Sequence, residues 1–275
     1  MRRFSDPPGT LWCRATREPA VRAARPDPDA GADVRNRALR HDERAALAAV
    51  VTDPGDLAWL ARRPQLVVRR AVARNPVLDA TTRDYLIAWA LRQRQPDPVI
   101  LNALAPWMSA AQLVDAAAEV RALAHWPDAL AREPDPVNVV RRVLRGEDWG
   151  PRARCEALVD LIHLVRVHQV PGLDLATALD DLACHPRINE YTVLRLAREV
   201  HGAPPAERRL VAAWIAERPN ALKQMADPFV HPVLATYLDE AVAAEPGLIG
   251  PLLCLIDEWS GSLTDLVATA RALVA

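Results

Sequence analysis

The feature that most limits what this chain can fold into is a phrase that recurs around proline. A charged or polar residue and a proline are followed by a short turn and then by a segment rich in Val and Leu. The residue before a proline is pushed out of the α region, so one helix ends there. Proline itself suits the first turn of the next helix, where its missing N–H costs nothing. Each phrase therefore predicts a helix, a tight corner and a second helix.

The phrase returns at a spacing typical of helical repeat proteins. It stands at Pro26, Pro64, Pro96 and Pro134, which are 38, 32 and 38 residues apart. A period of about 35 residues, with two or three helices per unit, lies in the range of solenoid repeats. Asp97 and Asp135 stand between two prolines, where we expect each aspartate to cap the next helix.

Composition agrees with a helical chain. Only 10 glycines stand against 24 prolines, whereas a sheet protein needs glycine in its hairpin turns. Hydrophobic residues make up 51% of the chain, which is enough for a sizeable core. No apolar stretch follows the charged residues 1–8 and no apolar run approaches a membrane span, so the sequence predicts a cytoplasmic protein. The predicted fold class is all-α, an α-solenoid formed by a superhelix of short helical repeats.

Three segments are expected along the chain: a basic N-terminal arm or cap over 1–24, regular helical repeats over 25–148, and divergent repeats over 149–275 that continue the same solenoid. In the last segment the patterns predict helices over 151–170, 188–200, 205–217, 229–243 and 262–273. An irregular joint is expected from Gly146 to Gly150. Charge changes sign nearby: residues 1–155 hold 25 arginines and 19 acids, a balance of +6, and residues 156–275 hold 9 basic and 16 acidic residues, a balance of −7.

One stretch resembles a known family. Residues 60–64 read L-A-R-R-P and residues 67–76 read V-V-R-R-A-V-A-R-N-P. This is similar to the V-R-x-x-V-A-x-N-P core of the leucine-rich repeat variant family, in which a Leu-bearing helix follows, here residues 82–89. The resemblance implies HEAT-type units in a curved superhelix. The family's repeat is shorter than the spacing in this chain, so variant-repeat and HEAT-like units both stay open. Some members carry an iron–sulfur segment with clustered cysteines; this sequence has no such cluster, and no cofactor is predicted.

The four cysteines are dispersed along the chain, at Cys13, Cys155, Cys184 and Cys254. In an apolar helical chain such cysteines are expected to be buried free thiols, and Cys155 most of all. The alternative is a zinc site in which Cys184 and His185 join His163 or His168. It is disfavoured because structural zinc sites show short paired spacings.

Glu156, Asp160 and His163 lie one turn apart on the predicted 151–170 helix. An Asp-x-x-His pair can supply half of a metal site in a helix bundle. No second half is visible in the sequence, so a solvated polar face is favoured and no metal site is predicted.

Two arginine clusters are the best functional hint. The candidate binding residues are Arg69, Arg70 and Arg74 in one unit and Arg141, Arg142 and Arg145 in another, at matching positions after Pro64 and Pro136. Equivalent positions in a solenoid share a face, where a basic stripe would bind a nucleic-acid backbone. Pairing of these arginines with acids inside the fold is favoured, and contact with a protein partner or with nucleic acid stays open.

The sequence favours a non-catalytic helical-repeat scaffold that presents a concave surface to a protein partner. The alternative is a nucleic-acid-binding HEAT-like protein, similar to the alkylpurine DNA glycosylases. No phosphate-binding Gly-rich loop, G-x-S-x-G or H-E-x-x-H occurs, so nothing indicates an enzyme, although that question stays open. The eight tryptophans are expected to be mostly core or corner residues, although Trp126, Trp149 and Trp259 stand near turns and could act as exposed anchors. The opposite charge of the two halves predicts weak, salt-sensitive head-to-tail self-association, and no membrane partner is predicted.

Overall fold

The computed structural model describes residues 39–117, 119–120, 122–147, 149 and 153–274. These residues form sixteen α-helices and four short 3-10 turns, without a strand among them, which confirms the predicted all-α class. The predicted 1–24 arm, the phrase at Pro26 and Cys13 lie outside the described residues. The chain divides into two compact units, residues 1–88 and 89–275. Within the described part, no helix combines the length and apolar character that crossing a membrane requires.

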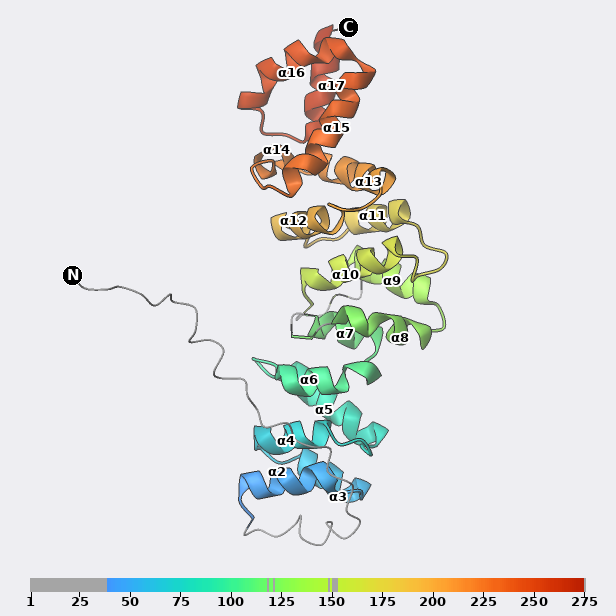
Figure 1. Ribbon diagram of the computed structural model, residues 1–275, viewed down its shortest axis with the longest axis vertical. Helices are drawn as coiled ribbons and strands as arrows, with labels where there is room; N and C mark the ends of the chain where they lie inside the picture. Colours follow the sequence, from blue (N-terminus) through green and yellow to red (C-terminus); the bar gives the residue numbers. More distant parts are fainter. Residues whose placement is uncertain (1–38, 118, 121, 148, 150–152, 275) are drawn as a thin grey trace, which may run out of the picture. The chain divides into compact units, whose positions relative to one another are not determined.

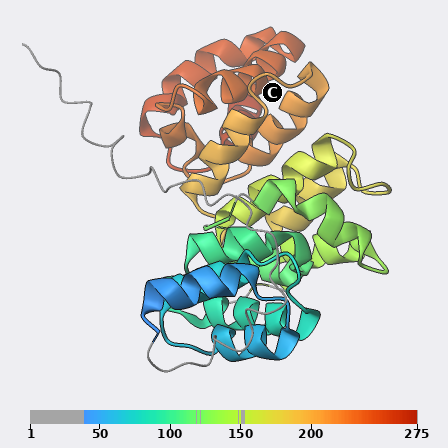
Figure 2. The same ribbon diagram turned by 60° about the horizontal axis from the view of Figure 1, so that its bottom comes forward.

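Unit 1 is organised around one short central helix. Its helices are α2 (His41–Val50), α3 (Pro54–Ala61), α4 (Leu66–Ala73) and the first part of α5 (Ala80–Arg92). Both α2 and α3 pack against α4, and Figure 2 shows these three helices, coloured blue to cyan, as one group. Leu57, Leu60, Val68 and Val72 are fully buried. Burial of these side chains removes apolar surface from water and holds the three helices together.

Unit 2 contains the remaining helices and the short 3-10 turns. They are α6 (Pro98–Leu104), η2 (Ala105–Trp107), α7 (Ala110–Ala116), η3 (Ala122–Ala124), α8 (Trp126–Ala131), α9 (Pro136–Arg145), α10 (Cys155–Arg166), α11 (Leu175–Ala183), α12 (Glu190–Glu199), α13 (Pro205–Ala216), α14 (Ala221–Gln224), α15 (Val230–Ala244), η4 (Pro246–Leu248), α16 (Ile249–Leu255), η5 (Ile256–Glu258) and α17 (Leu263–Val274).

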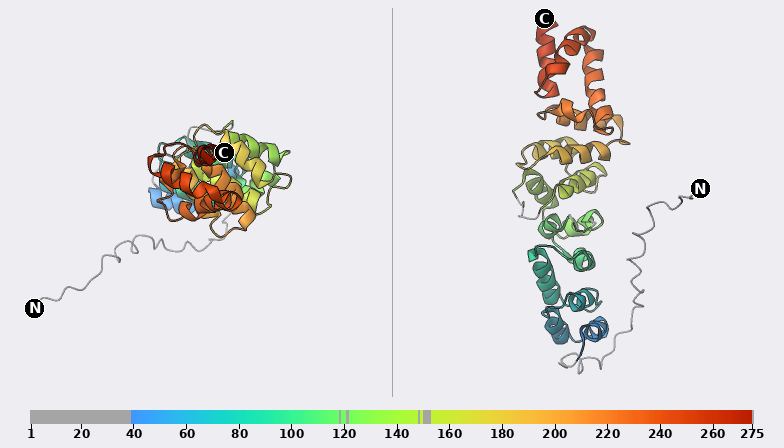
Figure 3. Two further views of the ribbon diagram at one scale, coloured as in Figure 1. Left: turned by 90° about the horizontal axis from the view of Figure 1, so that it is seen from above. Right: turned by 90° about the vertical axis from the view of Figure 1, so that its left-hand side faces the viewer.

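In the middle of unit 2, helices pack against helices two or three places further along the chain. α9 contacts α11 and α11 contacts α13, while α10 contacts α12 and α12 contacts α15. Figure 1 shows α9 beside α10, and α11 beside α12, as successive pairs. Further along, α15 and α17, in orange and red, are steeply inclined to α11 and α12 (Figure 3). The predicted apolar stripe of α10, formed by Leu158, Leu161, Ile162 and Val165, is buried, as expected.

Helices in both units end at the same kind of residue pair. A buried Leu, Val or Ile and then Ala close five helices, at Ala61, Ala73, Ala131, Ala183 and Ala216, and a proline follows three residues after each. The predicted corner before proline is therefore confirmed in the described part of the chain. The predicted caps are confirmed as well: Asp97 accepts from the Ile100 N–H and Asp135 from the Asn138 N–H, both at 3.0 Å.

One side chain caps α2 from the end of α4. Asn75 is 5% exposed, and its Nδ2 donates to the carbonyls of Ala48 and Val51, both at 2.9 Å. Its Oδ1 accepts from the Val77 N–H at 2.9 Å. The last carbonyls of a helix lack partners within the helix. Asn75 satisfies two carbonyls at the end of α2 and so fixes α2 to α4.

The segment that follows α11 repeats the conformation of the segment that follows α4. His185 stands where Asn75 stands, and its Nδ1 accepts from the Arg187 N–H at 3.1 Å just as Asn75 accepts from Val77. The likeness continues into the caps of the next helices, in which Asp79 accepts from the Thr82 N–H and Asn189 from the Thr192 N–H, both at 3.0 Å. Two stretches far apart in the sequence therefore form the same corner.

Gly146 explains why His185 need not cap the preceding helix as Asn75 does. It closes α9 in the left-handed region, at φ 80°, and its N–H and the Glu147 N–H bond the carbonyls of Val143 and Arg142. α9 therefore needs no side chain to cap it. A Cβ at Gly146 would lie 2.8 Å from Pro186 Cδ and 3.1 Å from His185 Cδ2. Glycine is thus required both by the backbone and by the close approach of α9 to the corner.

Most predicted helices of the divergent segment are present. Those expected over 151–170, 188–200, 205–217, 229–243 and 262–273 are α10, α12, α13, α15 and α17, with ends displaced by a few residues. α11, α14 and α16 were not expected. α11 was missed because α10 stops at Arg166, and a loop containing His168 and Gly172, both at positive φ, separates the two helices.

The predicted burial of the cysteines is wrong where the structure describes them. Cys184 and Cys254 are exposed and Cys155 is half-buried. Cys184 follows the last residue of α11, and Cys254 belongs to α16, in which Leu252 is the buried residue. Burial of the three tryptophans near turns agrees with the favoured core or corner positions rather than with exposed anchors: Trp126 is fully buried and Trp149 and Trp259 are half-buried, whereas Trp107 on η2 is 49% exposed.

Candidate functional site

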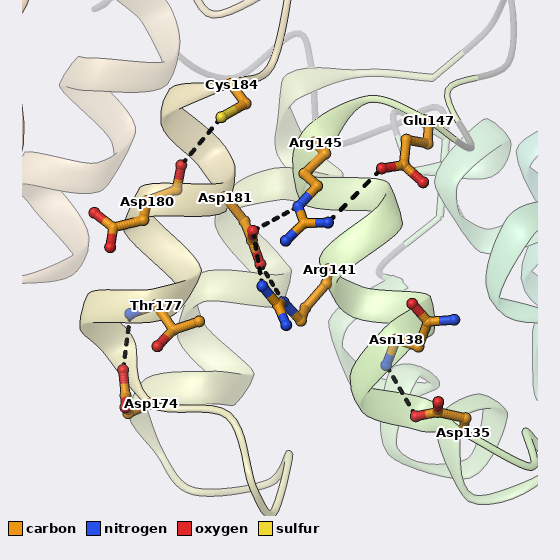
Figure 4. A network of polar contacts seen from close by, with 10 residues as sticks. All are labelled: Asp135, Asn138, Arg141, Arg145, Glu147, Asp174, Thr177, Asp180, Asp181 and Cys184. Carbon is orange, nitrogen blue, oxygen red and sulfur yellow. Dashed lines mark hydrogen bonds and ion pairs between the residues drawn. The ribbon is translucent and has the colours of Figure 1, made fainter.

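Two of the six candidate arginines bind one buried carboxylate. Asp181 on α11 has a side chain that is 6% exposed, and it accepts from Arg141 Nε at 2.7 Å and from Arg145 Nε at 2.6 Å (Figure 4). Burial alone would raise the pKa of Asp181, but the hydrogen bonds and charges of the two arginines lower it below its ordinary value. These arginines therefore join α9 to α11, which is the internal pairing that the sequence favoured.

The other four candidate arginines differ in how far they are buried. Arg69 is 8% exposed and its Nε donates to the Ala61 carbonyl at 2.9 Å, which ties α4 to the end of α3. Burial lowers the pKa of Arg69, and the nearby Tyr85 phenol offsets this in part. Arg70 is half-buried and Arg74 is exposed. Arg142 Nε lies 3.7 Å from Glu147 Oε2, a surface pair of small energetic weight.

The two clusters do not occupy matching helix positions, so this expectation is wrong. Arg69 is the fourth residue of α4 and Arg141 the sixth of α9. At about 100° per residue, the two positions differ by about 200° around a helix axis. The discrepancy arises because Pro64 precedes the N-cap residue of its helix, whereas Pro136 is itself the first helical residue.

A row of polar side chains joins α10 to α12. We call it the polar row; it comprises Glu156, Asp160, His163 and Arg166 of α10 and Tyr191, Arg195 and Glu199 of α12. At one end the Tyr191 hydroxyl donates to Glu156 Oε1 at 3.1 Å. At the other end Glu199 accepts from Arg166 Nη2 at 2.7 Å and pairs with His163 Nδ1. Spacings of three and four residues place each set on one helix face, so the two faces meet along their length.

Asp160 lies in the middle of the polar row without the partner that its neighbours have. No described residue donates a hydrogen bond to its carboxylate. Burial raises the pKa of Asp160 to about 6; Arg195 and His163 oppose this rise, while Glu156 and Glu199 add to it. A carboxyl group that titrates near neutral pH because it is withdrawn from water is typical of functional sites.

A pocket of about 470 Å³ opens beside Asp160. On one side it is lined by Glu156, Asp160 and Arg195, and on the other by Ala117, Val120, Ala122, Leu123 and Ala124. Val120 and Ala122 are only 6% and 1% exposed, and η3 packs against α10. An apolar wall with a few convergent polar groups is the usual composition of a ligand pocket.

At the opposite end of the polar row, Arg166 is paired with two carboxylates. Arg166 donates to Glu199 at 2.7 Å and to Glu207 of α13 at 3.4 Å. Burial alone would lower the pKa of Arg166, and the two carboxylates more than reverse that effect. A second pocket, of about 390 Å³, lies beside Arg166 and Glu207. Because Arg166 already has two carboxylate partners, this end serves to join α10, α12 and α13.

The expectation that Glu156, Asp160 and His163 form a solvated face is therefore wrong. These side chains face α12 and share contacts with its polar residues. The sequence does contain a signal for this arrangement: Tyr191, Arg195 and Glu199 follow one another at intervals of four residues, the same face spacing as on α10. Two consecutive helices with matched polar faces indicate contact between those faces rather than exposure to water.

In the described part of the chain, no three His, Cys, Asp or Glu side chains lie close enough together to hold a metal ion. No family model, curated protein or solved structure matches the chain. Function must therefore be inferred from the polar row and the pocket beside it.

Proposed function

We propose that this chain is a helical-repeat protein that binds a protein partner, and that it acts as a scaffold rather than as an enzyme. Its helices form an α-solenoid of leucine-rich repeat variant or HEAT-like type, and the partner lies on the concave surface. The observation that carries the proposal is the polar row, in which Asp160 is half-buried at the edge of an open pocket and accepts no hydrogen bond from a described residue.

The repeat character is supported by local structure. Asn75 and His185 occupy the same corner conformation, and each corner brings a helix against the one two places before it: α4 against α2, and α11 against α9. A unit of two short helices buries too little surface to fold alone, so packing between every second helix is what stabilises a solenoid.

A binding role is supported by the chemistry of the exposed end of the polar row. Tyr191 is 44% exposed and its hydroxyl is anchored on Glu156, so the ring is presented to solvent in a fixed position. Arg195 lies next to it, 6.0 Å from the ring centroid. Tyrosine and arginine, together with tryptophan, are the residue types most often found to dominate the energy of protein–protein interfaces.

Selection of peptides from a random displayed library against the full chain tests this function. The proposal expects peptides that bind the natural chain and bind the double variant Tyr191→Ala, Arg195→Gln at least tenfold more weakly. Trp107→Ala, which removes an exposed aromatic from η2 of the same unit, is the matched control and should leave binding unchanged. Failure of any peptide to enrich, or equal binding to the double variant, contradicts the proposal.

Nucleic-acid binding by a protein similar to the alkylpurine DNA glycosylases is the second possibility from the sequence. The pairing of Arg141 and Arg145 with Asp181 weighs against it, because a phosphate would have to compete with a buried carboxylate for both guanidinium groups. Backbone binding would also show a steep salt dependence. A gel-shift titration with duplex DNA at low salt distinguishes the two functions, and tight, salt-sensitive binding would favour the second.

A further inference from the structure

We infer that the pocket beside Asp160 takes an arginine or lysine side chain of a protein partner. This inference rests on the proposed function and adds to it the chemistry of the anchor. Two properties of the pocket lead to it: the Asp160 carboxylate, which accepts no hydrogen bond from a described residue, and a group of apolar lining residues that can contact an aliphatic stem.

The Asp160 carboxylate favours a positively charged ligand. Along the polar row, Glu156 has the Tyr191 hydroxyl and Glu199 has both Arg166 and His163. Asp160 is left with the more distant charges of Arg195 and His163 and with no hydrogen bond from a described residue. Withdrawing a carboxylate from water is unfavourable unless a paired or hydrogen-bonding group compensates for it. A guanidinium or ammonium group that enters the pocket compensates the Asp160 carboxylate in this way.

The apolar lining residues favour a ligand in which an aliphatic stem carries the cation. Val120, Ala122 and Leu123 line the side of the pocket opposite to Asp160. A volume of about 470 Å³ lies within the range of about 300–1,000 Å³ that is usual for ligand pockets, so one long side chain and some water fit. Arginine and lysine commonly lay their methylene groups on apolar surface while the charged end meets a polar group.

Arg195 is the third charged group at the rim of the pocket, and it favours a peptide over a free amine as the ligand. The Arg195 guanidinium makes no hydrogen bond to any described residue, although it lies at the same pocket as two carboxylates. It is positioned to donate to a carbonyl, and a side chain that arrives on a peptide brings its own backbone carbonyls. The balance of −7 over residues 156–275 further favours the approach of a basic partner.

Three small probes titrated into the full chain test the inference, with binding followed by protein NMR. Butylguanidinium carries the arginine head and stem, butylurea has the same shape without the charge, and N-acetyl-arginine amide adds the peptide groups. We expect butylguanidinium to bind with shifts at Leu123 and Asp160, butylurea to bind at least tenfold more weakly, and N-acetyl-arginine amide to bind more tightly than butylguanidinium.

Variants separate the groups at the rim. Asp160→Asn should weaken butylguanidinium binding at least tenfold, and Asp180→Asn, an exposed aspartate of α11, should leave it unchanged. Arg195→Gln should remove the advantage of N-acetyl-arginine amide over butylguanidinium. No binding of butylguanidinium at any concentration, or equal binding to Asp160→Asn, overturns the inference. Equal binding of the two cationic probes overturns the assignment to a protein-borne side chain.

These results are separable from the test of the proposed function. Selected peptides that lack basic residues and still depend on Tyr191 would sustain the protein-binding function and refute the basic anchor. Butylguanidinium binding at Asp160, together with failure of any peptide to enrich, would sustain the pocket chemistry and refute the protein-binding function.

Discussion

Replacing Asp160 by Asn should stabilise the protein at pH 8, which is the opposite of what most substitutions of half-buried residues do. Burial raises the pKa of Asp160 from its ordinary value of 3.8 to about 6. Above pH 6 the folded protein must hold a carboxylate that would be better solvated in the unfolded chain. Asparagine has nearly the same shape and no charge, so it removes that cost.

The size of the effect follows from the pKa difference. A rise from 3.8 to about 6, at about 1.4 kcal/mol per pKa unit, corresponds to an upper value of about 3 kcal/mol. Asp160 is only partly buried and water screens it, so we expect a gain of about 1–2 kcal/mol. The sign depends on pH. Well below pH 3.8 aspartate is protonated in both states and the gain vanishes; it grows as pH rises from there to about 6 and is complete above it.

Urea unfolding followed by circular dichroism at pH 8 and at pH 4 measures this gain. The midpoint for Asp160→Asn should exceed that of the natural chain at pH 8, and by a much smaller margin at pH 4. Asp180→Asn, on the exposed face of α11, should change neither midpoint. A variant that is less stable than the natural chain at pH 8, or a difference that is equal at both pH values, would refute the reasoning that Asp160 lacks compensation.

Three further predictions follow from the corners and from the charge distribution. Gly146→Ala should destabilise unit 2 by about 2 kcal/mol or more, because φ is 80° and the new Cβ meets Pro186, whereas Gly172→Ala, at φ 88° but with 3.7 Å of clearance, should cost about 1 kcal/mol; thermal unfolding compares them. Asn75→Ala should cost about 2–4 kcal/mol, because two carbonyls of α2 lose their donors, and hydrogen exchange in α2 should rise; unchanged exchange contradicts this. Light scattering at low and high salt should show weak self-association that salt weakens, and a monomer under all conditions contradicts it.

Much of the helical framework could be predicted because it depends on local rules. Proline three residues after a Leu-Ala or Ile-Ala pair ends a helix whatever surrounds it, and Asp97 and Asp135 cap the next helix through their own backbone neighbours. The spacing of Leu158, Leu161 and Val165 likewise fixes the buried face of α10.

The site could not be predicted in the same way because it depends on which faces meet. Glu156, Asp160 and His163 have the same spacing whether they face water or α12, and only the packing of α10 on α12 decides between the two. α11 escaped prediction because the left-handed residue that helps to end α10 is His168 rather than glycine. Asp181 cannot be distinguished from surface acids in the sequence, because its role depends on α9 placing Arg141 and Arg145 beside it.

The most direct test of the central claim is the pKa of Asp160 itself, measured by a carboxyl-carbon NMR titration of the full chain with and without butylguanidinium. The groups that face Asp160 are Glu156 and His163 on α10 and Arg195 and Glu199 on α12, and the assigned resonance of Asp160 reports their combined effect. We predict a pKa of about 6 in the free protein and a fall of about one unit or more when the cation binds, since a bound cation stabilises the carboxylate. A value near 3.8 in the free protein, or one that saturating butylguanidinium leaves unchanged, would contradict the claim that this pocket is built for a basic side chain.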